Sequence, residues 1–370
     1  MEHAFGRETP FGLGIEEELL LVDPLTLRLT NRASELRERV DPAAGHVTND
    51  VYEALIELST PVVRSAPEGR DALATLRDDL CRAGATLLGA GLHPDAPFGD
   101  VEHVPTPRYA AIREAMRGLL ERTPTAALHV HVGMPDPETA IAVCNRLRAH
   151  LPLLQALAAN SPYWHGRDSG FASARSMVFR AFPRAIVPPT FAGWDHYADF
   201  VARWEAAGDI ADYTYLWWDV RPSPRLGTVE VRAMDAQSRL ESSAGLAALV
   251  HALALACADG HEEATLPSEA LAESQFRAGR DGLDATVWWR GALRPIRSVA
   301  ADTLALARPY ARELDGEDGL EEVERILRDG GGADRMRAAH APGGLDDVLA
   351  RLVEETYSST HTTSPIESQS

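Results

Sequence analysis

The alternation of apolar and polar residues predicts strands in the first two thirds of the chain and helices in the last third. A period of two indicates a strand, and apolar residues three and four positions apart indicate a helix. The predicted strands cover residues 11–23, 55–63, 126–132, 213–220 and 228–234, with a helix as the alternative at 55–63. The predicted helices cover residues 67–90, 106–121, 136–159 and 194–207, before an almost wholly helical region from 238 to 357. This order indicates an α+β or mixed α/β fold with a helical C-terminal half.

Four other segments have composition typical of turns or loops. Residues 25–49 are polar and predict a short hairpin return and a loop, and residues 221–224 predict the turn between the last two strands. Residues 160–193 are rich in Gly, Pro, Ser and Arg, and are too long for a passive connection, so we expect a functional or mobile loop. The Ser/Thr-rich tail, 358–370, is expected to be disordered. We interpret residues 1–357 as one domain, with a sheet-bearing core at 11–235 and a mainly helical part at 238–357.

The first predicted strand contains three consecutive acids, Glu16, Glu17 and Glu18, within an otherwise apolar run. Side chains alternate along a strand, so Glu16 and Glu18 share one face and Glu17 takes the other. Two carboxylates on one sheet surface repel each other and are costly to desolvate, and a divalent cation between them removes that cost. The alternative is a strand edge whose acids reach solvent or pair with arginines.

Three further patterns place acids or histidines on apolar strands. His129 and His131 lie one residue apart and therefore face the same way, which suits a metal or phosphate site. Glu230 and Arg232 likewise share a face, as a cross-strand ion pair or as part of a site. Glu57 lies in the apolar run 55–58, where an unpaired carboxylate is costly. A sheet lined by these groups is rich in oxygen and poor in imidazole, which favours Mg²⁺ or Mn²⁺ over Zn²⁺.

Composition excludes several function classes. A net charge of −19, from 36 basic and 55 acidic residues, argues against a nucleic-acid partner. Every basic residue is arginine, which excludes P-loop and Schiff-base lysines and leaves arginine to hold phosphate or carboxylate. Cys81, Cys144 and Cys257 are too far apart to indicate disulfides or zinc. With no signal sequence and no apolar run approaching 18 residues, we expect a cytoplasmic protein without a membrane partner.

Six segments resemble motifs of the bacterial carboxylate–amine ligases, which belong with the type 2 glutamate–cysteine ligases. They are residues 14–18 (GIEEE), 57–61 (ELSTP), 129–133 (HVHVG), 160–162 (NSP), 218–222 (WDVRP) and 227–232 (GTVEVR). The resemblance implies the glutamine synthetase catalytic architecture: a curved, mostly antiparallel sheet with helices on its outer face and metal ions on the inner one. It also implies an ATP-dependent enzyme that joins a small-molecule carboxylate, by default glutamate, to an amine, by default cysteine, through an acyl phosphate. Sheets of this type often assemble, so a homo-oligomer is one expectation.

The resemblance further implies roles for individual residues. Glu16, a histidine and Glu230 resemble the ligands of the Mg²⁺ or Mn²⁺ ion that bridges the ATP phosphates, with His129 slightly favoured over His131. Glu18 and Glu57 resemble ligands of a second ion. Arg232 resembles the arginine that steadies the transferred phosphoryl group, and Asp50 resembles the acid that receives the amine.

The loop at 160–193 carries Ser173, Arg175 and Arg180, which we interpret as substrate-binding residues. Arg175 suits a two-point contact with a substrate carboxylate, or equally an ion pair with one of the chain's acids. Arg221 either holds phosphate or fixes the turn. Trp217 and Trp218 are more typical of a core or cavity wall than of an adenine stack.

Two other functions remain open at this stage. A metal-dependent amidohydrolase also uses His-x-His on a strand, but needs further histidines on later strands, whereas the other histidines here lie in predicted helices and loops. A non-catalytic descendant that binds nucleotide is disfavoured by the intact acids at Glu16, Glu18, Glu57 and Glu230.

Overall fold

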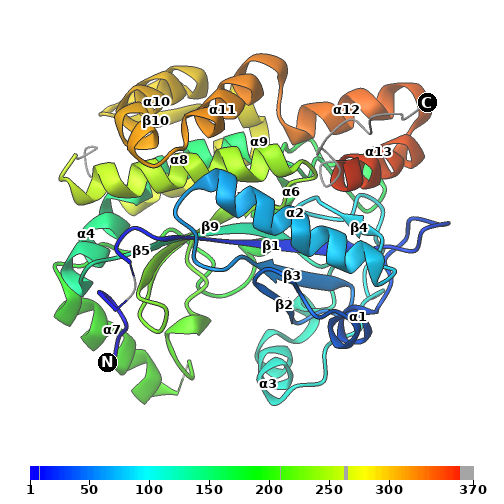
Figure 1. Ribbon diagram of the computed structural model, residues 1–370, viewed down its shortest axis with the longest axis horizontal. Helices are drawn as coiled ribbons and strands as arrows, with labels where there is room; N and C mark the ends of the chain where they lie inside the picture. Colours follow the sequence, from blue (N-terminus) through cyan, green and yellow to red (C-terminus); the bar gives the residue numbers. More distant parts are fainter. Residues whose placement is uncertain (8, 209, 262–265, 359–370) are drawn as a thin grey trace, which may run out of the picture.

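A seven-stranded sheet lies at the centre of the protein (Figure 1). The computed structural model describes residues 1–7, 9–208, 210–261 and 266–358. The strands of this sheet are β1 (Leu13–Leu21), β2 (His46–Asn49), β3 (Leu55–Ser59), β4 (Leu87–Leu88), β5 (Ala127–Gly133), β8 (Val220–Ser223) and β9 (Thr228–Asp235). Their order is β2-β3-β1-β5-β9-β8, with β4 paired to β1, and each of these pairs is antiparallel. The predicted α+β class with an antiparallel sheet is confirmed.

Helices make up most of the remaining described chain. They are α1 (Ala33–Arg39), α2 (Ala66–Arg82), α3 (Pro107–Met116), α4 (Pro137–Leu147), α5 (Leu151–Leu157), α6 (Ala174–Phe179), α7 (Trp194–Ala207), α8 (Leu240–Ala258), α9 (Ser268–Asp281), α10 (Ile296–Glu313), α11 (Glu317–Asp329), α12 (Gly332–Gly343) and α13 (Leu345–Ser358). Short 3₁₀ turns cover Arg117–Leu119, Arg148–His150, Tyr213–Tyr215 and Gly282–Asp284. Two small hairpins complete the fold: β6 (Tyr163–Trp164) with β7 (Arg167–Asp168), and β10 (Thr286–Trp289) with β11 (Ala292–Pro295).

The alternation of β1 decides which face of the sheet is covered. Its apolar odd-numbered residues, Leu13, Ile15, Leu19 and Leu21, are buried in the main hydrophobic cluster, and Glu17 shares their face. Helices α2 and α8 lie against this face (Figure 1), and the cluster continues through them into α10 and α11. The even-numbered residues Glu16 and Glu18 face the other way. One continuous core therefore joins the sheet to the C-terminal helices α8, α10 and α11.

Two predicted elements have different boundaries in the structure. The single helix expected at 136–159 is two helices, α4 and α5, separated by the 3₁₀ turn Arg148–His150. Pro152 lies in the first turn of α5, where its missing N–H costs nothing. The strand expected at 213–220 is a 3₁₀ turn followed by β8, so most of the predicted turn at 221–224 lies within a strand. Because β8 is at the edge of the sheet, it tolerates Pro222.

Three segments contain more regular structure than the sequence pattern predicted. Residues 25–49 include α1 and β2, and the loop at 160–193 includes the β6–β7 hairpin and α6. The β10–β11 hairpin interrupts the region predicted to be almost wholly helical. The tail predicted to be disordered lies, from residue 359 onward, outside the described residues, while Ser358 ends α13.

Helix α8 corrects the expectation that no segment is long and apolar enough to span a membrane. Its 19 residues pass that test by length and composition, but 94% of the apolar window is buried inside the protein, as in a core helix.

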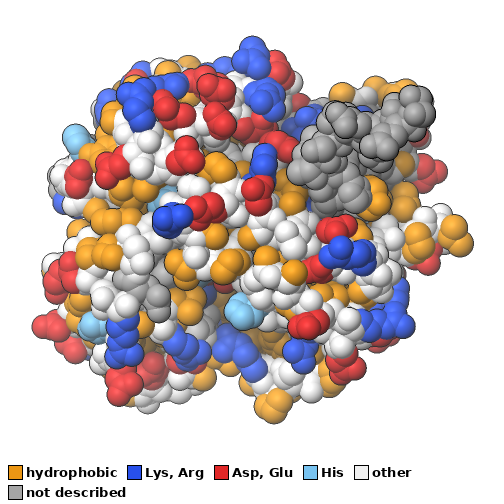
Figure 2. Space-filling model, in the orientation of Figure 1, with side chains coloured by type: hydrophobic (Ala, Val, Ile, Leu, Met, Phe, Trp, Pro, Cys, Tyr) orange, Lys and Arg blue, Asp and Glu red, His pale blue; other side chains and the backbone are white. Residues whose placement is uncertain are grey.

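On the surface above it, acidic and arginine side chains are interspersed over α10 and α11 (Figure 2), as in the ion pair of Arg308 with Glu324.

Candidate active site

The strand register brings distant acids and histidines into one row on the inner face of the sheet. Glu18 of β1 pairs with Glu57 of β3, and Glu16 pairs with His129 of β5. Two residues further along β5, His131 pairs with Glu230 of β9, which in turn pairs with Arg221 of β8. Side chains opposite each other on neighbouring strands lie in contact distance, so the row is continuous across five strands.

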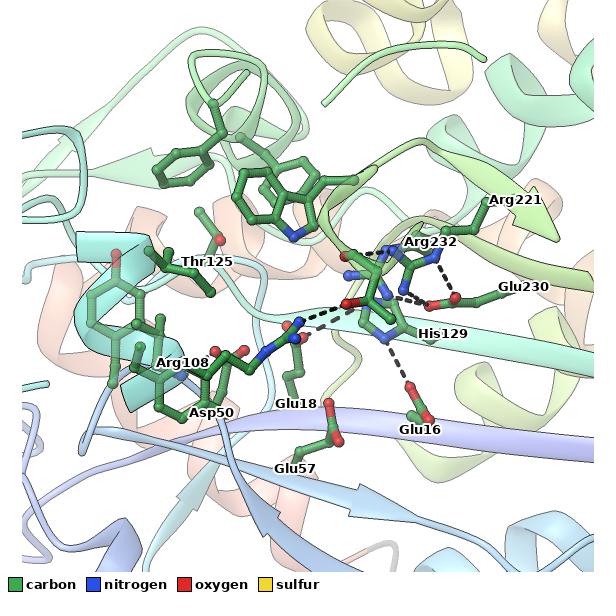
Figure 3. A pocket seen from close by; sticks show the side chains of 18 of the residues that line it. Glu16, Glu18, Asp50, Glu57, Arg108, Thr125, His129, Arg221, Glu230 and Arg232 are labelled. Atoms are coloured by element: carbon green, nitrogen blue, oxygen red, sulfur yellow. Dashed lines mark hydrogen bonds and ion pairs between the residues drawn. The ribbon is translucent and has the colours of Figure 1, made fainter. Parts of the chain in front are cut away.

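This row forms the floor of a cavity of about 490 Å³ (Figure 3). Of the residues predicted to bind metal, substrate or phosphate, the following line the cavity: Glu16, Glu18, Asp50, Glu57, His129, His131, Arg175, Arg221, Glu230 and Arg232. Apolar and aromatic side chains from β2–β3, α3, α6 and the segment before β8 form its walls. The structure therefore gathers residues separated by more than two hundred positions into one polar site with apolar walls.

Two groups of potential metal ligands share Glu16. Glu16, His131 and Glu230 form one, and Glu16, Glu57 and His129 form the other, with the ligand atoms of each group within 4.8 Å of one another. Glu18 adjoins the second group, because its Oε1 lies 3.8 Å from Nε2 of His129. This grouping places His131, rather than the slightly favoured His129, with Glu16 and Glu230.

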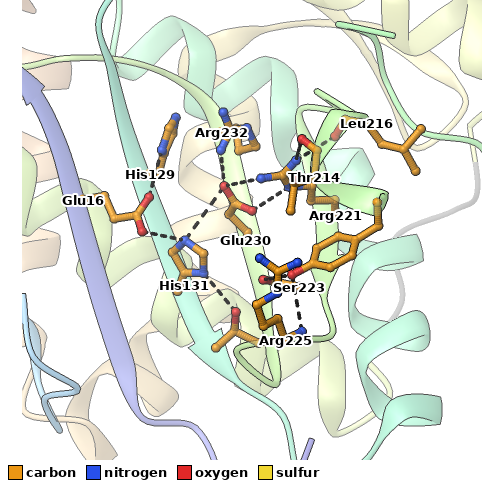
Figure 4. A network of polar contacts seen from close by, with 12 residues as sticks. Glu16, His129, His131, Thr214, Leu216, Arg221, Ser223, Arg225, Glu230 and Arg232 are labelled. Atoms are coloured by element: carbon orange, nitrogen blue, oxygen red, sulfur yellow. Dashed lines mark hydrogen bonds and ion pairs between the residues drawn. The ribbon is translucent and has the colours of Figure 1, made fainter. Parts of the chain in front are cut away.

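Glu16 is held between the two histidines (Figure 4). Its Oε2 lies 3.1 Å from Nδ1 of His129, and its Oε1 lies 3.4 Å from Nε2 of His131. Burial opposes ionisation of Glu16, but His131 and His129 together outweigh burial and lower the pKa of its carboxyl. Burial also lowers the pKa of His129, to about 4, with a contribution from Arg232. Burial acts in the same direction on His131, but Glu16 and Glu230 raise the pKa of that imidazole overall.

Glu18, Glu57 and Asp50 are acids whose charge the protein does not fully compensate. Burial, followed by the nearby Asp50, raises the pKa of Glu18 to about 8. Burial and the neighbouring Glu16 and Glu18 raise the pKa of Glu57 well above its usual value. Burial also raises the pKa of Asp50. Clustered carboxylates of this kind are poised to receive cations.

Glu230 is fixed by two arginines (Figure 4). Nε of Arg221 lies 2.6 Å from Oε2 of Glu230, and Nη1 of Arg232 forms a second ion pair with Oε1. Burial disfavours the charge of Glu230, but Arg221 and Arg232 outweigh it and hold its pKa well below the usual value. Arg221 also donates to the backbone oxygens of Thr214 and Leu216, so it holds the segment before β8.

The donor set fits Mg²⁺ or Mn²⁺. Glu16, Glu18, Glu57 and Glu230 supply carboxylate oxygen, the ligand type that these hard cations prefer. Nε2 of His131 is buried and has no hydrogen-bond partner among the described residues, although two carboxylates lie within 4 Å of it. A cation between these groups would satisfy this nitrogen and offset the repulsion of the acids.

Comparison with known proteins decides the family. A model of glutamate–cysteine ligase family 2 matches residues 12–355. A protein of Rubrobacter xylanophilus, provisionally named glutamate–cysteine ligase 2-3, is 40% identical over 365 residues, which cover 96% of this chain and 100% of that protein. The glutamate–cysteine ligase of Haloquadratum walsbyi is 34% identical over 358 residues, 93% of this chain and 96% of that protein. The chain belongs to glutamate–cysteine ligase family 2.

The fold of this family 2 ligase also resembles that of a distant solved structure. The glutamate–cysteine ligase of Francisella tularensis, solved in complex with AMP, aligns with a TM-score of 0.66 and 14% identity over 95% of this chain and 90% of that one. Family membership over nearly the whole chain makes the protein an ATP-dependent carboxylate–amine ligase. A metal-dependent amidohydrolase would need further histidines at the site. Among the described residues that line the cavity, the only histidines are His129 and His131, so this alternative is not favoured.

Two of the predicted substrate-binding residues of the ligase do not line the cavity. Ser173 is fully buried, caps α6 by accepting a hydrogen bond from the Ser176 amide, and donates to Oδ1 of Asp235. Arg180 donates to Gln275 and forms an ion pair with Asp219. Both side chains therefore bind other parts of the protein. Of the three residues that sequence analysis assigned to substrate binding in this loop, Arg175 lines the cavity.

Other lining residues of the ligase were not singled out by sequence. Arg108, at the start of α3, extends over the cavity and donates to Oγ1 of Thr214 at 3.0 Å (Figure 3). Tyr109 and Thr125 also line it. No local pattern marked these residues, because helix α3 reads as an ordinary surface helix. Trp217 lines the wall, whereas Trp218 is buried in the core, as the sequence interpretation allowed.

Proposed function

We propose that this ligase activates the side-chain carboxylate of glutamate with ATP and joins it to the amine of an α-amino acid. The observation that carries the proposal is the row of Glu57, Glu18, Glu16, His131 and Glu230 on one cavity floor, in two ligand groups that share Glu16. Glutamate and cysteine are the substrates named in the relatives. The protein acts, on this proposal, on small molecules in the cytoplasm.

The chemistry requires two transfers. A carboxylate resists attack by an amine because its leaving group would be oxide. A carboxylate oxygen of the substrate therefore attacks the γ-phosphorus of ATP, the bond from that phosphorus to the bridging oxygen breaks, and ADP leaves. The amine nitrogen then attacks the acyl carbon, the carbon–oxygen bond to phosphate breaks, and phosphate leaves as the amide forms.

Glu16, His131 and Glu230 would hold one divalent cation, and Glu57 with His129, Glu16 and the adjacent Glu18 would hold a second. When bound, these ions neutralise the phosphate charge and align the phosphoryl group. The choice of His131 as the ligand of the first cation rests on the ligand grouping. It reverses the slight preference for His129 that the family resemblance implied.

Arg232 is placed to stabilise charge on the transferred phosphoryl group. Its Nη1 is engaged by Glu230, while its Nε is buried without a hydrogen-bond partner among the described residues. Phosphoryl transfer depends on positioned positive charge rather than on covalent help from the protein, and a planar guanidinium supplies it at two points.

Asp50 is placed to receive the amine and its proton. It lies at the cavity beside Glu18, with which it shares a hydrogen bond, and burial raises its pKa. A carboxylate with a raised pKa accepts a proton from the substrate ammonium more readily than an ordinary surface aspartate, and the resulting amine can then attack the acyl carbon.

Hydroxylamine tests this function without any assumption about the natural amine. It attacks an acyl phosphate to give a hydroxamate, which is measured by the colour of its iron(III) complex. With ATP, Mg²⁺ and glutamate, we expect hydroxamate and ADP in equal amounts, and neither when ATP or glutamate is omitted. Hydroxamate or amide formed without ATP, or ATP hydrolysis with no hydroxamate from glutamate, would contradict the proposal. Glu230→Gln is expected to remove the activity, with Glu354→Gln on the exposed face of α13 as the control.

A further inference from the structure

Beyond Asp50, one end of the cavity has an apolar wall. Val51 follows Asp50 in the chain, and Ile112, Met116 and Leu120 face it from α3 and the segment after it. All four are less than 9% exposed and belong to one hydrophobic cluster, and the hydroxyl of Tyr52 fixes this wall by donating to the backbone oxygen of Leu120 at 3.0 Å. These side chains are rigidly packed, so the wall is preformed.

Phe179 of α6 and Phe182, which follows this helix, also line the cavity. The guanidinium carbon of Arg175 lies 5.3 Å from the ring centre of Phe179, and that ring lies 5.8 Å from Phe182. Phe182 packs in turn against the same cluster as Met116 and Leu120. Together with the apolar wall, these rings give the cavity an apolar part, the recess, in addition to its charged floor.

Arg175 is a buried cation that lacks a close partner within the protein. Only 3% of it is exposed, its Nη1 lies 3.7 Å from Asp235, and its Nε has no hydrogen-bond partner among the described residues. Asp235 is itself occupied by the hydroxyls of Ser161 and Ser173. A guanidinium in this state is stabilised by an anion from outside, and a carboxylate matches its fork.

Asp50 and Arg175 both line the cavity, and both act electrostatically on Glu18. An acid for an ammonium, a guanidinium for a carboxylate and an apolar recess in the same cavity match the three substituents of an α-amino acid. We propose that the amine substrate of this ligase is an α-amino acid with a large apolar side chain, of the leucine, methionine or phenylalanine class, rather than cysteine. The inference rests on the proposed function, and adds the identity of the acceptor.

The reason for a large side chain is the extent of the apolar wall. The single CH₂–SH group of cysteine would cover little of it and leave the rest against water or empty space. Each additional buried methylene is worth roughly 4-fold in binding and up to about 10-fold or more in a fitted pocket. Leucine or methionine should therefore exceed cysteine by at least about 10-fold in kcat/KM.

The test is a competition between acceptors in the full-length enzyme with ATP, Mg²⁺ and glutamate. Amide products are quantified by mass spectrometry from mixtures of cysteine, alanine, leucine, methionine and phenylalanine. We expect at least one large apolar amino acid to be used about 10-fold better than cysteine or alanine, and leucinamide, which lacks the carboxylate, to be used poorly. Equal or better use of cysteine would overturn this inference while hydroxamate formation keeps the ligase function intact. Absence of hydroxamate would overturn both.

Two variants of the recess, with a control variant on α3, sharpen the test. Met116→Phe reduces the recess, so the leucine-to-alanine ratio of kcat/KM should fall about 10-fold. Ala115→Phe adds the same ring at the neighbouring, exposed position, and should leave that ratio unchanged. Phe182→Ala enlarges the recess and should shift the preference toward phenylalanine, which keeps the proposal testable if Met116→Phe does not fold. Ratios that stay the same in both recess variants would show that the acceptor side chain binds elsewhere.

Discussion

Glu17 and its two neighbours in β1 differ in the face of the sheet to which they point. Glu17 lies on the helix-covered face, fully buried with the equally buried Arg77, and accepts from Arg77 Nε and Nη2 at 2.9 and 2.8 Å. Ser243 of α8 donates to the same carboxylate. Glu16 and Glu18 face the cavity, where histidines and other acids surround them. The protein compensates Glu17 with a buried arginine and Glu16 with two histidines, whereas burial and the nearby Asp50 raise the pKa of Glu18.

The outer pair also ties distant elements together. Arg77 donates to the backbone oxygens of Gln237 and Ser238, which follow β9, and to Thr356 of α13. The same junction contains Glu355, which pairs with arginines from α12, α13 and the segment before α8. Buried ion pairs on this side therefore fix the sheet to its helices, while the charges on the inner side line the cavity.

The largest expected effect comes from breaking the outer pair. Glu17→Gln leaves Arg77 buried and uncompensated, so the free energy of unfolding should fall by about 3–5 kcal/mol. Urea unfolding followed by circular dichroism measures this, and Glu16→Gln is the matched comparison, expected to cost less because Glu230 remains to compensate His131. Equal stability of the two variants would remove the distinction between the faces.

The same two substitutions should have opposite rank in catalysis. Glu16→Gln removes a ligand shared by both cation groups, so kcat for ATP-dependent hydroxamate formation should fall by about 10²–10³-fold, or about 2.7–4 kcal/mol. Glu17→Gln, assayed at a temperature at which it is folded, should stay within about threefold of the unmodified enzyme. Near-normal turnover of Glu16→Gln would refute the cation assignment.

Arg232→Lys probes the inner face without changing its charge. Lysine cannot reproduce the planar contacts, so kcat should fall by about 10–100-fold, with KM for ATP within about threefold. Steady-state kinetics separate the two parameters. Arg312→Lys, at a surface ion pair with Glu317, is the control. If both parameters are unchanged in Arg232→Lys, Arg232 has a structural role.

The smallest effect concerns the pH dependence of the outer side. Burial opposes ionisation of Glu355, but Arg239, Arg335 and Ser238 outweigh it and lower its pKa to about 2. Because this folded-state pKa lies below the unfolded one, the stabilisation is present above about pH 4.5 and is lost as the pH falls toward 2. Allowing for solvent screening, Glu355→Gln should cost about 1–2 kcal/mol at pH 7 and little at pH 2.5. A loss that does not depend on pH would contradict this origin.

Local rules predicted much of the fold and the identity of the inner acids. The alternation in β1 correctly assigned Glu16 and Glu18 to one face and Glu17 to the other, and Asp136 caps α4 by accepting from the Thr139 amide at 2.8 Å, as expected. The segments whose secondary structure was predicted wrongly, such as β8 and the β10–β11 hairpin, are short, and their neighbours in the tertiary structure decide their conformation.

By itself, the sequence determined which residues are acidic, which face each one takes on its own strand, and which family motifs they form. These properties depend on period and residue type, which are local. Only the tertiary structure decided that Glu57 lies opposite Glu18 and Glu230 opposite His131, that Ser173 and Arg180 belong to the scaffold, and that Arg108 reaches the cavity. Strand register and helix placement come from the packing of residues far apart in the chain, so no local pattern carries that information.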